Sequence, residues 1–149
     1  MTLRFRNLDV SPEAPVEEWP TEGFIAALER GSLPDWRRIV RAVRDEPWGP
    51  VARRLEDALA TTQPYGTGVL MSRALEQARA EAVRREREAV AARVRSLFEL
   101  SGLDRRSFAA AIGTSTSRLS TYLNGRVAPS STLLVRMEGV ARRAAEPDP

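Results

Sequence analysis

Apolar residues recur at intervals of three and four along most of the chain, which is the spacing of an amphipathic helix, and no stretch shows the period-two alternation of a strand. Three short helices are expected after residue 20. The first is capped by Thr21 and ends at Gly31, the second starts at Ser32, and the third starts at Gly49-Pro50. Their apolar faces contain Phe24, Ile25 and Leu28, then Trp36, Ile39, Val40 and Val43, then Val51, Leu55, Ala58 and Leu59. We expect these faces to pack into a small helical bundle over residues 21–68.

Two segments around this bundle lack helical periodicity. Residues 1–20 contain Pro12, Pro15 and Pro20 and are expected to form an extended arm that drapes over the bundle. Residues 61–67 form the connection to the next helix. The glycines of this connection do not indicate a phosphate-binding loop, because no strand precedes them and no Gly-Lys-Ser/Thr sequence follows.

A long helix is expected next, because residues 69–100 contain neither proline nor glycine and are rich in alanine, glutamate and arginine. Residues 69–89 would connect the bundle to the C-terminal part of the chain. One apolar stripe is expected to contain Leu75, Ala78, Ala82, Ala89, Val90, Val94 and Leu97. Residues 84–88 are all charged, and two interpretations remain open for this segment: a self-supporting spacer, or part of a dimerising coiled coil.

Two short helices joined by a tight turn are predicted after the long helix. Asp104 is placed to cap the first, which buries Phe108 and Ile112, and Gly113 ends it with a left-handed turn. Ser115 is placed to cap the second, whose buried residues are Leu119, Tyr122 and Leu123 before Asn124-Gly125 ends it. The small Ala109, four residues before the glycine, lets the two helices approach closely. This pattern is typical of a helix-turn-helix.

The outward face of the second helix carries short hydroxyl side chains, namely Thr116, Ser117, Ser120 and Thr121. These residues are poor helix formers, and a merely structural surface would favour Glu, Lys, Arg or Ala. Short hydroxyl groups allow a helix backbone to come close to base edges in a DNA major groove. The pattern favours base reading over a polar surface without a ligand.

The composition excludes several kinds of functional site, and the distribution of charge indicates a kind of partner. The chain has no cysteine and no histidine, which removes disulfides, thiolate nucleophiles, histidine bases and the usual zinc ligands, so we expect no enzyme activity, no cofactor and no metal. All 23 cationic residues are arginine. Residues 1–68 contain 9 arginines and 11 acids, whereas residues 69–149 contain 14 and 9; within these, residues 105–143 contain seven arginines and one acid, Glu138. A polyanion is the expected partner of this basic segment.

From about Val90 to Arg143 the sequence resembles the Cro and phage-repressor type of helix-turn-helix domain, also called the xenobiotic-response-element family. The resemblance rests on Phe108-Ala109, Gly113, Leu119, Asn124-Gly125-Arg126, Pro129-Ser130 and the apolar positions Leu133, Leu134 and Met137. It implies an all-α domain of about five helices over residues 90–145, with the third helix in the major groove.

The resemblance also implies roles for individual residues. The base-reading positions of the family correspond to Thr116, Ser117 and Thr121, and Ser120 is an additional candidate. Phosphate contacts are implied near the start of the first helix and in the loop after the second, at Arg105, Asn124 and Arg126. We add Arg106 beside Arg105, and Ser115 and Arg118 at the edge of the hydroxyl-bearing helix. Hydroxyl residues replace the glutamines that often read adenine in phage repressors.

These observations together predict a DNA-binding transcription regulator, a repressor that binds double-stranded DNA as a homodimer on a pseudo-palindromic operator. An alternative is an antitoxin-type autorepressor whose N-terminal half binds and neutralises a protein partner. Trp19, Trp36 and Trp48 would suit such a partner surface where exposed, although tryptophans in a small bundle are commonly core residues. No segment resembles a membrane span or an export signal, so a cytoplasmic, nucleoid-associated protein is expected.

Overall fold

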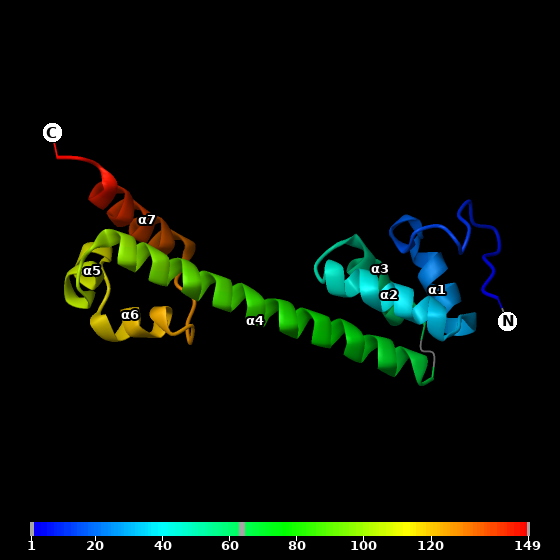
Figure 1. Cartoon of the computed structure of the whole chain (residues 1–149). Coiled ribbons are helices and arrows are strands. Elements are labelled where there is room, and N and C mark those ends of the chain that lie inside the picture. The colour runs from blue at the N-terminus through cyan, green and yellow to red at the C-terminus, as the bar shows by residue number, and fades with distance from the viewer. Residues whose placement is uncertain (1, 63–64, 149) are drawn as a thin grey trace. The chain divides into compact units, whose positions relative to one another are not determined.

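The computed structural model describes residues 2–62 and 65–148. The described chain is all-helical and contains no strand (Figure 1). Its elements are the 3-10 helix η1 (Val16–Glu18) and the α-helices α1 (Thr21–Arg30), α2 (Leu33–Asp45), α3 (Pro50–Thr61), α4 (Thr67–Ser101), α5 (Arg105–Ile112), α6 (Thr116–Leu123) and α7 (Ser131–Ala145). Two compact units divide the chain, Met1–Ala82 and Val83–Pro149, so the boundary falls inside α4. The expected connection over residues 61–67 lies partly outside the described residues.

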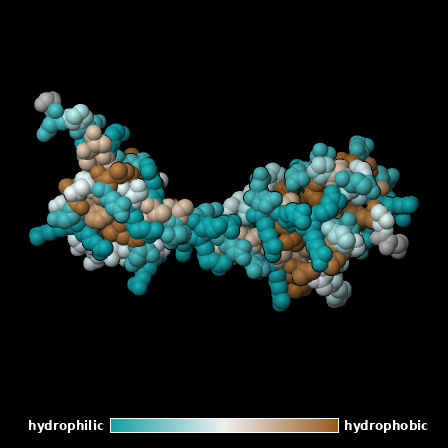
Figure 2. Space-filling view, viewed as in Figure 1, coloured by the Kyte–Doolittle hydropathy of each residue, from teal (hydrophilic) through white to brown (hydrophobic). Residues whose placement is uncertain are grey.

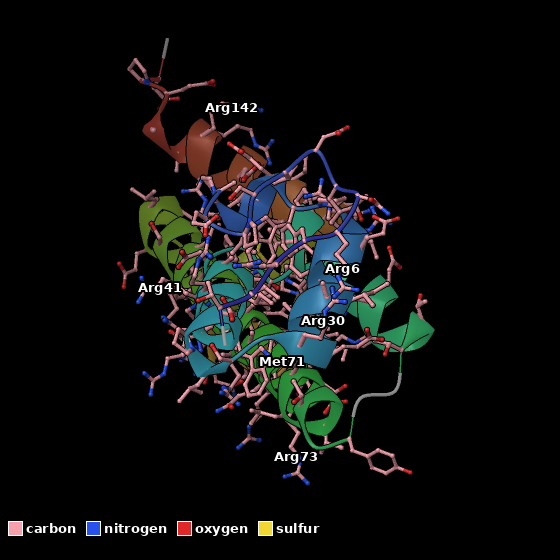
Figure 3. All side chains as sticks on the ribbon, turned by 90° about the vertical axis from the view of Figure 1, so that its right-hand side faces the viewer. Arg6, Arg30, Arg41, Met71, Arg73 and Arg142 are labelled. Carbon is pink, nitrogen blue, oxygen red and sulfur yellow. The ribbon has the colours of Figure 1, made fainter. Side chains whose placement is uncertain are left out.

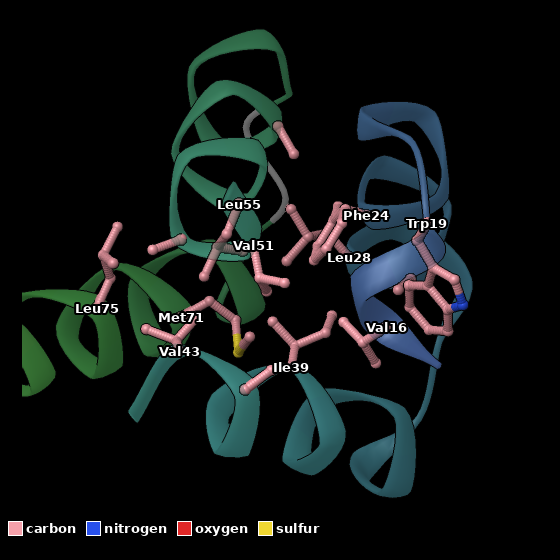
Figure 4. Packing of buried hydrophobic residues seen from close by; sticks show 14 of the residues in the cluster. Val16, Trp19, Phe24, Leu28, Ile39, Val43, Val51, Leu55, Met71 and Leu75 are labelled. Atoms are coloured by element: carbon pink, nitrogen blue, oxygen red, sulfur yellow. The ribbon is translucent and has the colours of Figure 1, made fainter. Parts of the chain in front are cut away.

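Helices α1, α2 and α3 contact one another and form the predicted N-terminal bundle. The core contains seven residues of the predicted apolar faces, namely Phe24, Leu28, Ile39, Val43, Val51, Leu55 and Ala58. The segment before α1 and the beginning of α4 supply much of the rest. Figure 4 shows Met71 of α4 packed among Ile39 of α2 and Leu55 of α3, all three with no exposed surface. The core of the bundle therefore includes side chains of α4 in addition to those of the three expected helices.

The helices of the bundle begin and end close to the residues that the sequence predicts, but the two ends of α1 differ from the expected caps. Pro20 occupies the cap position of α1, so Thr21 is the first helical residue instead of the cap. Gly31 ends α1 in an extended conformation, at φ −74° and ψ 176°, and not in a left-handed turn. Glycine is needed there for space, because a Cβ atom would collide with the carbonyl oxygen of Ala27. For α2, the Ser32 backbone N–H donates to Asp35 at 2.9 Å, as in a capping box.

Residues 2–20 are irregular apart from η1, and they pack against the bundle. The indole ring of Trp19 is fully buried and contacts Phe5 and Phe24 edge to face, with ring centroids 5.1 and 5.8 Å away. Arg38 of α2 donates hydrogen bonds to the carbonyl oxygens of Pro12 and Ala14, each at 2.7 Å. These contacts make the N-terminal segment part of the core of its unit.

Helix α4 is one continuous helix of 35 residues, starting two residues before the predicted Val69. Leu75, Ala78 and Ala82 are buried, as the predicted stripe requires. The prediction was wrong at Ala89, which is exposed, whereas Ala91 is 1% exposed. The stripe does not continue unchanged along α4, because the helix contributes to two separate cores.

The second unit is built from the C-terminal part of α4 together with α5, α6 and α7. Figure 1 shows the three short helices gathered around the end of α4. The core consists of Val94, Leu97, Phe108, Ala109, Ile112, Leu119, Tyr122, Leu123, Leu133, Met137, Val140 and Ala141. Its described residues form four helices, whereas the family resemblance implied about five.

Candidate DNA interface

The turn between α5 and α6 has the geometry that the sequence predicted. Asp104 caps α5 by accepting a hydrogen bond from the backbone N–H of Ser107 at 2.8 Å, and this bond holds the pKa of Asp104 below its ordinary value. Gly113 ends α5 in the left-handed region, at φ 78° and ψ 37°, where a side chain would be strained. Ser115 then caps α6 by accepting from the N–H of Arg118 at 3.2 Å.

The two helices are held together by large side chains on their facing sides. Phe108 of α5 and Leu119 of α6 have no exposed surface, and Ala109 is 1% exposed. Phe108 also packs edge to face against Phe98 of α4, with ring centroids 5.3 Å apart. A rigid helix pair on a shared core is the support that a base-reading helix needs, because its position determines which base edges it reaches.

The predicted base-reading residues differ in their exposure. Thr116 and Ser117, in the first turn of α6, are exposed, whereas Ser120 and Thr121 are half-buried. The Thr121 hydroxyl donates to the carbonyl oxygen of Arg118 at 2.6 Å. Ser120 lines a cavity of about 300 Å³ together with residues of α4 and α5. We call Thr116, Ser117, Ser120 and Thr121 the hydroxyl face.

All six residues predicted to contact phosphate are exposed, and they lie in three places of the second unit. Arg105 and Arg106 occupy the first turn of α5, Ser115 and Arg118 the start of α6, and Asn124 and Arg126 the loop after α6. The Asn124 side chain accepts from the backbone N–H of Arg126 at 3.0 Å, which fixes this loop. Within the described residues, none of these four arginines forms an ion pair with an acidic side chain.

Two arginines that sequence reasoning missed hold the ends of these helices. Arg95 of α4 donates to the carbonyl oxygen of Leu123, the last residue of α6, at 2.9 Å, and to Glu88 at 2.7 Å. Arg136 of α7 donates to the carbonyl oxygen of Ile112, the last residue of α5, at 3.3 Å. Each guanidinium satisfies a carbonyl group that the helix itself leaves unpaired. The Glu88 and Arg95 spacing was visible in the sequence, but the carbonyl partners depend on the tertiary fold.

We expect the variant Arg95→Lys to bind DNA about tenfold more weakly, because lysine cannot make both hydrogen bonds and the end of α6 would lose its support. The charge is kept, so the dependence of affinity on salt should not change. Fluorescence anisotropy with a labelled duplex measures both quantities. Arg93→Lys on the same helix is the control, since Arg93 is 53% exposed and forms a long ion pair with Glu138 at 3.7 Å. Equal affinities for Arg95→Lys and the wild-type protein would contradict a positioning role.

The geometry of α5 and α6 is that of a helix-turn-helix, a motif found in many DNA-binding proteins. Residues 94–141 match the model of the helix-turn-helix family of the Cro/C1 type, which is a family of DNA-binding transcription regulators and not of enzymes. The match covers about a third of the chain and lies entirely in the second unit. No curated protein and no solved structure matches the chain. The C-terminal unit thus carries the DNA-binding domain of a transcription regulator.

Residues 2–62 and 65–148 contain no group of three or more acidic side chains arranged to hold a metal ion. In the same residues, no helix is both long enough and apolar enough to span a membrane.

Proposed function

We propose that the protein is a sequence-specific repressor that reads DNA with the hydroxyl face of α6. The observation that carries this proposal is the contrast between the two sides of α6. Leu119, Tyr122 and Leu123 are buried, and the opposite side presents short hydroxyl groups with arginines at its edges. Hydroxyl groups donate to and accept from base edges, and the methyl group of threonine contacts the methyl group of thymine.

We propose different roles for the four residues of the hydroxyl face, and their exposure and hydrogen bonds support this division. Thr116 and Ser117 are exposed in the first turn of α6, and their hydroxyl groups are proposed to donate to bases or accept from them. Because the Thr121 hydroxyl proton is engaged by Arg118, Thr121 would contribute its methyl group, or accept from a base amino group. Ser120, which is half-buried, is proposed to contact the DNA at the side of the major groove.

The exposed arginines are proposed to bind the DNA backbone. Arg105 and Arg106 precede the hydroxyl face in the chain and Arg126 follows it, and Arg118, Ser115 and Asn124 supply further donors. Phosphate contacts of this kind position the protein on the duplex without reading sequence. Each phosphate contact releases condensed counterions, so log affinity falls with log salt at a slope of about −0.9 per phosphate neutralised.

The variant Arg126→Ala tests the backbone role. We expect weaker binding to every duplex sequence and a plot of log affinity against log salt that is flatter by about one unit. A salt titration with one operator duplex and one random duplex measures this. Arg53→Ala, which removes an exposed arginine from α3 in the N-terminal unit, should leave the slope unchanged. An unchanged slope for Arg126→Ala would contradict a phosphate contact at this position.

A homodimer is part of the proposal. One eight-residue helix reaches only a few base pairs, so a useful specificity needs two copies on a pseudo-palindrome whose half-sites are about one helical turn, ~34 Å, apart. We propose three parts for the chain after residue 20: an N-terminal bundle over residues 21–68, a connecting helix over residues 69–89 and the DNA-binding domain over residues 90–145. The bundle and the connecting helix are then available for dimer formation.

We propose a second role for the N-terminal unit, the binding of a protein partner, as in an antitoxin that represses its own operon. The support is the exposed apolar surface of this unit, which Figure 2 shows in brown between hydrophilic side chains. Leu33 and Leu70 are 48% and 53% exposed and Trp48 is 54% exposed, whereas Trp19 is core. Large apolar side chains left on a surface are typical of interaction sites.

A further inference from the structure

A groove of about 520 Å³ lies between α2 and the beginning of α4, within the N-terminal unit. Its apolar wall is made of Leu33, Trp36 and Val40 from α2 and of Leu70, Met71 and Ala74 from α4. Met71 has no exposed surface and belongs to the core, as Figure 4 shows, while Leu33 and Leu70 are about half exposed. We call this feature the α2–α4 groove.

The wall of the groove is preformed. The indole N–H of Trp36 donates to the carbonyl oxygen of Ala27 at 2.8 Å, which holds this ring against α1. Helix α2 already buries Ile39, Ala42 and Val43 in the bundle core, so Leu33 and Val40 extend its apolar surface beyond what the fold uses. An apolar surface of this kind, on two neighbouring helices, is suited to receive a third helix.

Three arginines border the groove along α2. Arg37, Arg41 and Arg44 are spaced by four and three residues, and all three are exposed. Figure 3 labels Arg41, which extends outward from α2. None of the three forms an ion pair in the described part of the chain, and Asp45 is the one acid among the residues that line the groove.

The net charge of the groove lining is opposite in sign to that of the N-terminal unit. Residues 1–82 contain 11 arginines and 13 acidic residues, a net charge of −2, whereas the groove lining contains three arginines and one acid, a net charge of +2. Arg37 and Arg41, which are four residues apart on α2, repel each other. An acidic partner would relieve this repulsion and gain opposite charges along the groove.

We propose that the α2–α4 groove binds an acidic amphipathic helix of another protein. Apolar side chains at helical spacing enter between Leu33 and Leu70, and carboxylates at their flanks pair with Arg37, Arg41 and Arg44. The proposal rests on the second role, protein binding by the N-terminal unit, and it names the surface and the chemical class of the partner. It is independent of DNA binding by the second unit.

A second copy of this chain does not supply such a helix in the described residues. Outside the groove, two pairs of exposed large apolar residues have helical spacing, Tyr65 with Val69 and Leu100 with Leu103. A glycine with positive φ lies between the two members of each pair, Gly66 at 72° just before α4 and Gly102 at 65° just after it, so each pair spans an end of the helix. Neither pair can present a continuous apolar stripe, so the occupant is assigned to a different protein.

The test uses the full chain and two designed helical peptides labelled with fluorescein. Both peptides carry leucines at positions i, i+3 and i+7, flanked by glutamates in one peptide and by lysines in the other. Fluorescence anisotropy should show the acidic peptide binding at least about tenfold more tightly than the basic one. Arg41→Glu and Leu70→Glu should each weaken its binding about tenfold or more, and Arg53→Glu, an exposed arginine of α3 outside the groove, should not.

Several results would overturn the proposal: no binding of the acidic peptide, equal binding of the two peptides, or binding that neither groove variant weakens. Self-association of the protein that Leu70→Glu abolishes would assign the groove to a second copy and overturn the choice of partner. Thermal unfolding followed by circular dichroism confirms that the variants fold, since both changed residues are exposed. DNA affinity is measured on the same samples and should be unchanged, so failure of the groove is distinguishable from failure of DNA binding.

Discussion

Replacing Thr116 and Ser117 together with alanine should abolish the preference for one DNA sequence. We expect affinity for the operator to fall about a hundredfold, because each lost base contact is worth about 1–3 kcal/mol, while affinity for random duplex stays the same. Both side chains are exposed and neither caps α6, since Ser115 has that role. Competition binding with a labelled operator and unlabelled random duplex measures the two affinities in one experiment.

The controls for this variant separate base reading from folding. Alanine is a better helix former than serine or threonine, so the double variant should melt no lower than the wild-type protein. Arg126→Ala provides the contrast, because it should weaken both affinities by the same factor. Equal loss of operator and random binding in the double variant, or a preserved preference, would contradict base reading by these residues.

Phe108→Ala should lower the free energy of unfolding of the C-terminal unit by about 3–5 kcal/mol, which is the usual cost of removing a buried aromatic ring. Phe108 has no exposed surface and contacts Phe98 across the core that supports both helices of the DNA interface. DNA binding should be lost together with this fold. Chemical denaturation followed by circular dichroism and by DNA binding measures the effect.

The tryptophans offer a sharp control for this prediction. Trp19, Trp36 and Trp48 all lie in the N-terminal unit, so tryptophan fluorescence reports on that unit alone. In Phe108→Ala the fluorescence transition should stay in place while the loss of helix moves to lower denaturant. Phe24→Ala, in the core of the first unit, should shift the fluorescence transition instead. A fluorescence transition that moves equally in Phe108→Ala would contradict separate cores.

Features set by neighbouring residues were predictable from the sequence. The caps at Asp104 and Ser115 and the left-handed turn at Gly113 depend on a few adjacent positions, and the structure has all three. The apolar faces of α1, α2 and α3 were also predictable, because helical spacing alone determines which side chains point the same way. The same reasoning failed at Ala89, since one stripe was extended along a helix that serves two cores.

Features that join distant parts of the chain were beyond sequence reasoning. Arg38 donates to the carbonyl oxygens of Pro12 and Ala14, and Arg95 donates to that of Leu123. Every residue has a backbone carbonyl group, so the sequence does not indicate which of them will accept such a bond. The α2–α4 groove depends on how closely two helices pack, and Leu70 was not assigned to any apolar face. The roles of the hydroxyl face and of the six phosphate residues stay predictions, which the DNA-binding variants test.

The central claim, that the protein is a dimeric reader of DNA sequence, is tested most directly by selecting bound duplexes from a random pool. The purified full chain is used at near-physiological salt, because affinities for DNA depend strongly on ionic strength. We predict that the recovered sequences share an inverted repeat with half-sites about one helical turn, ~34 Å, apart. Recovery of duplexes with no shared sequence would contradict sequence-specific reading by the hydroxyl face.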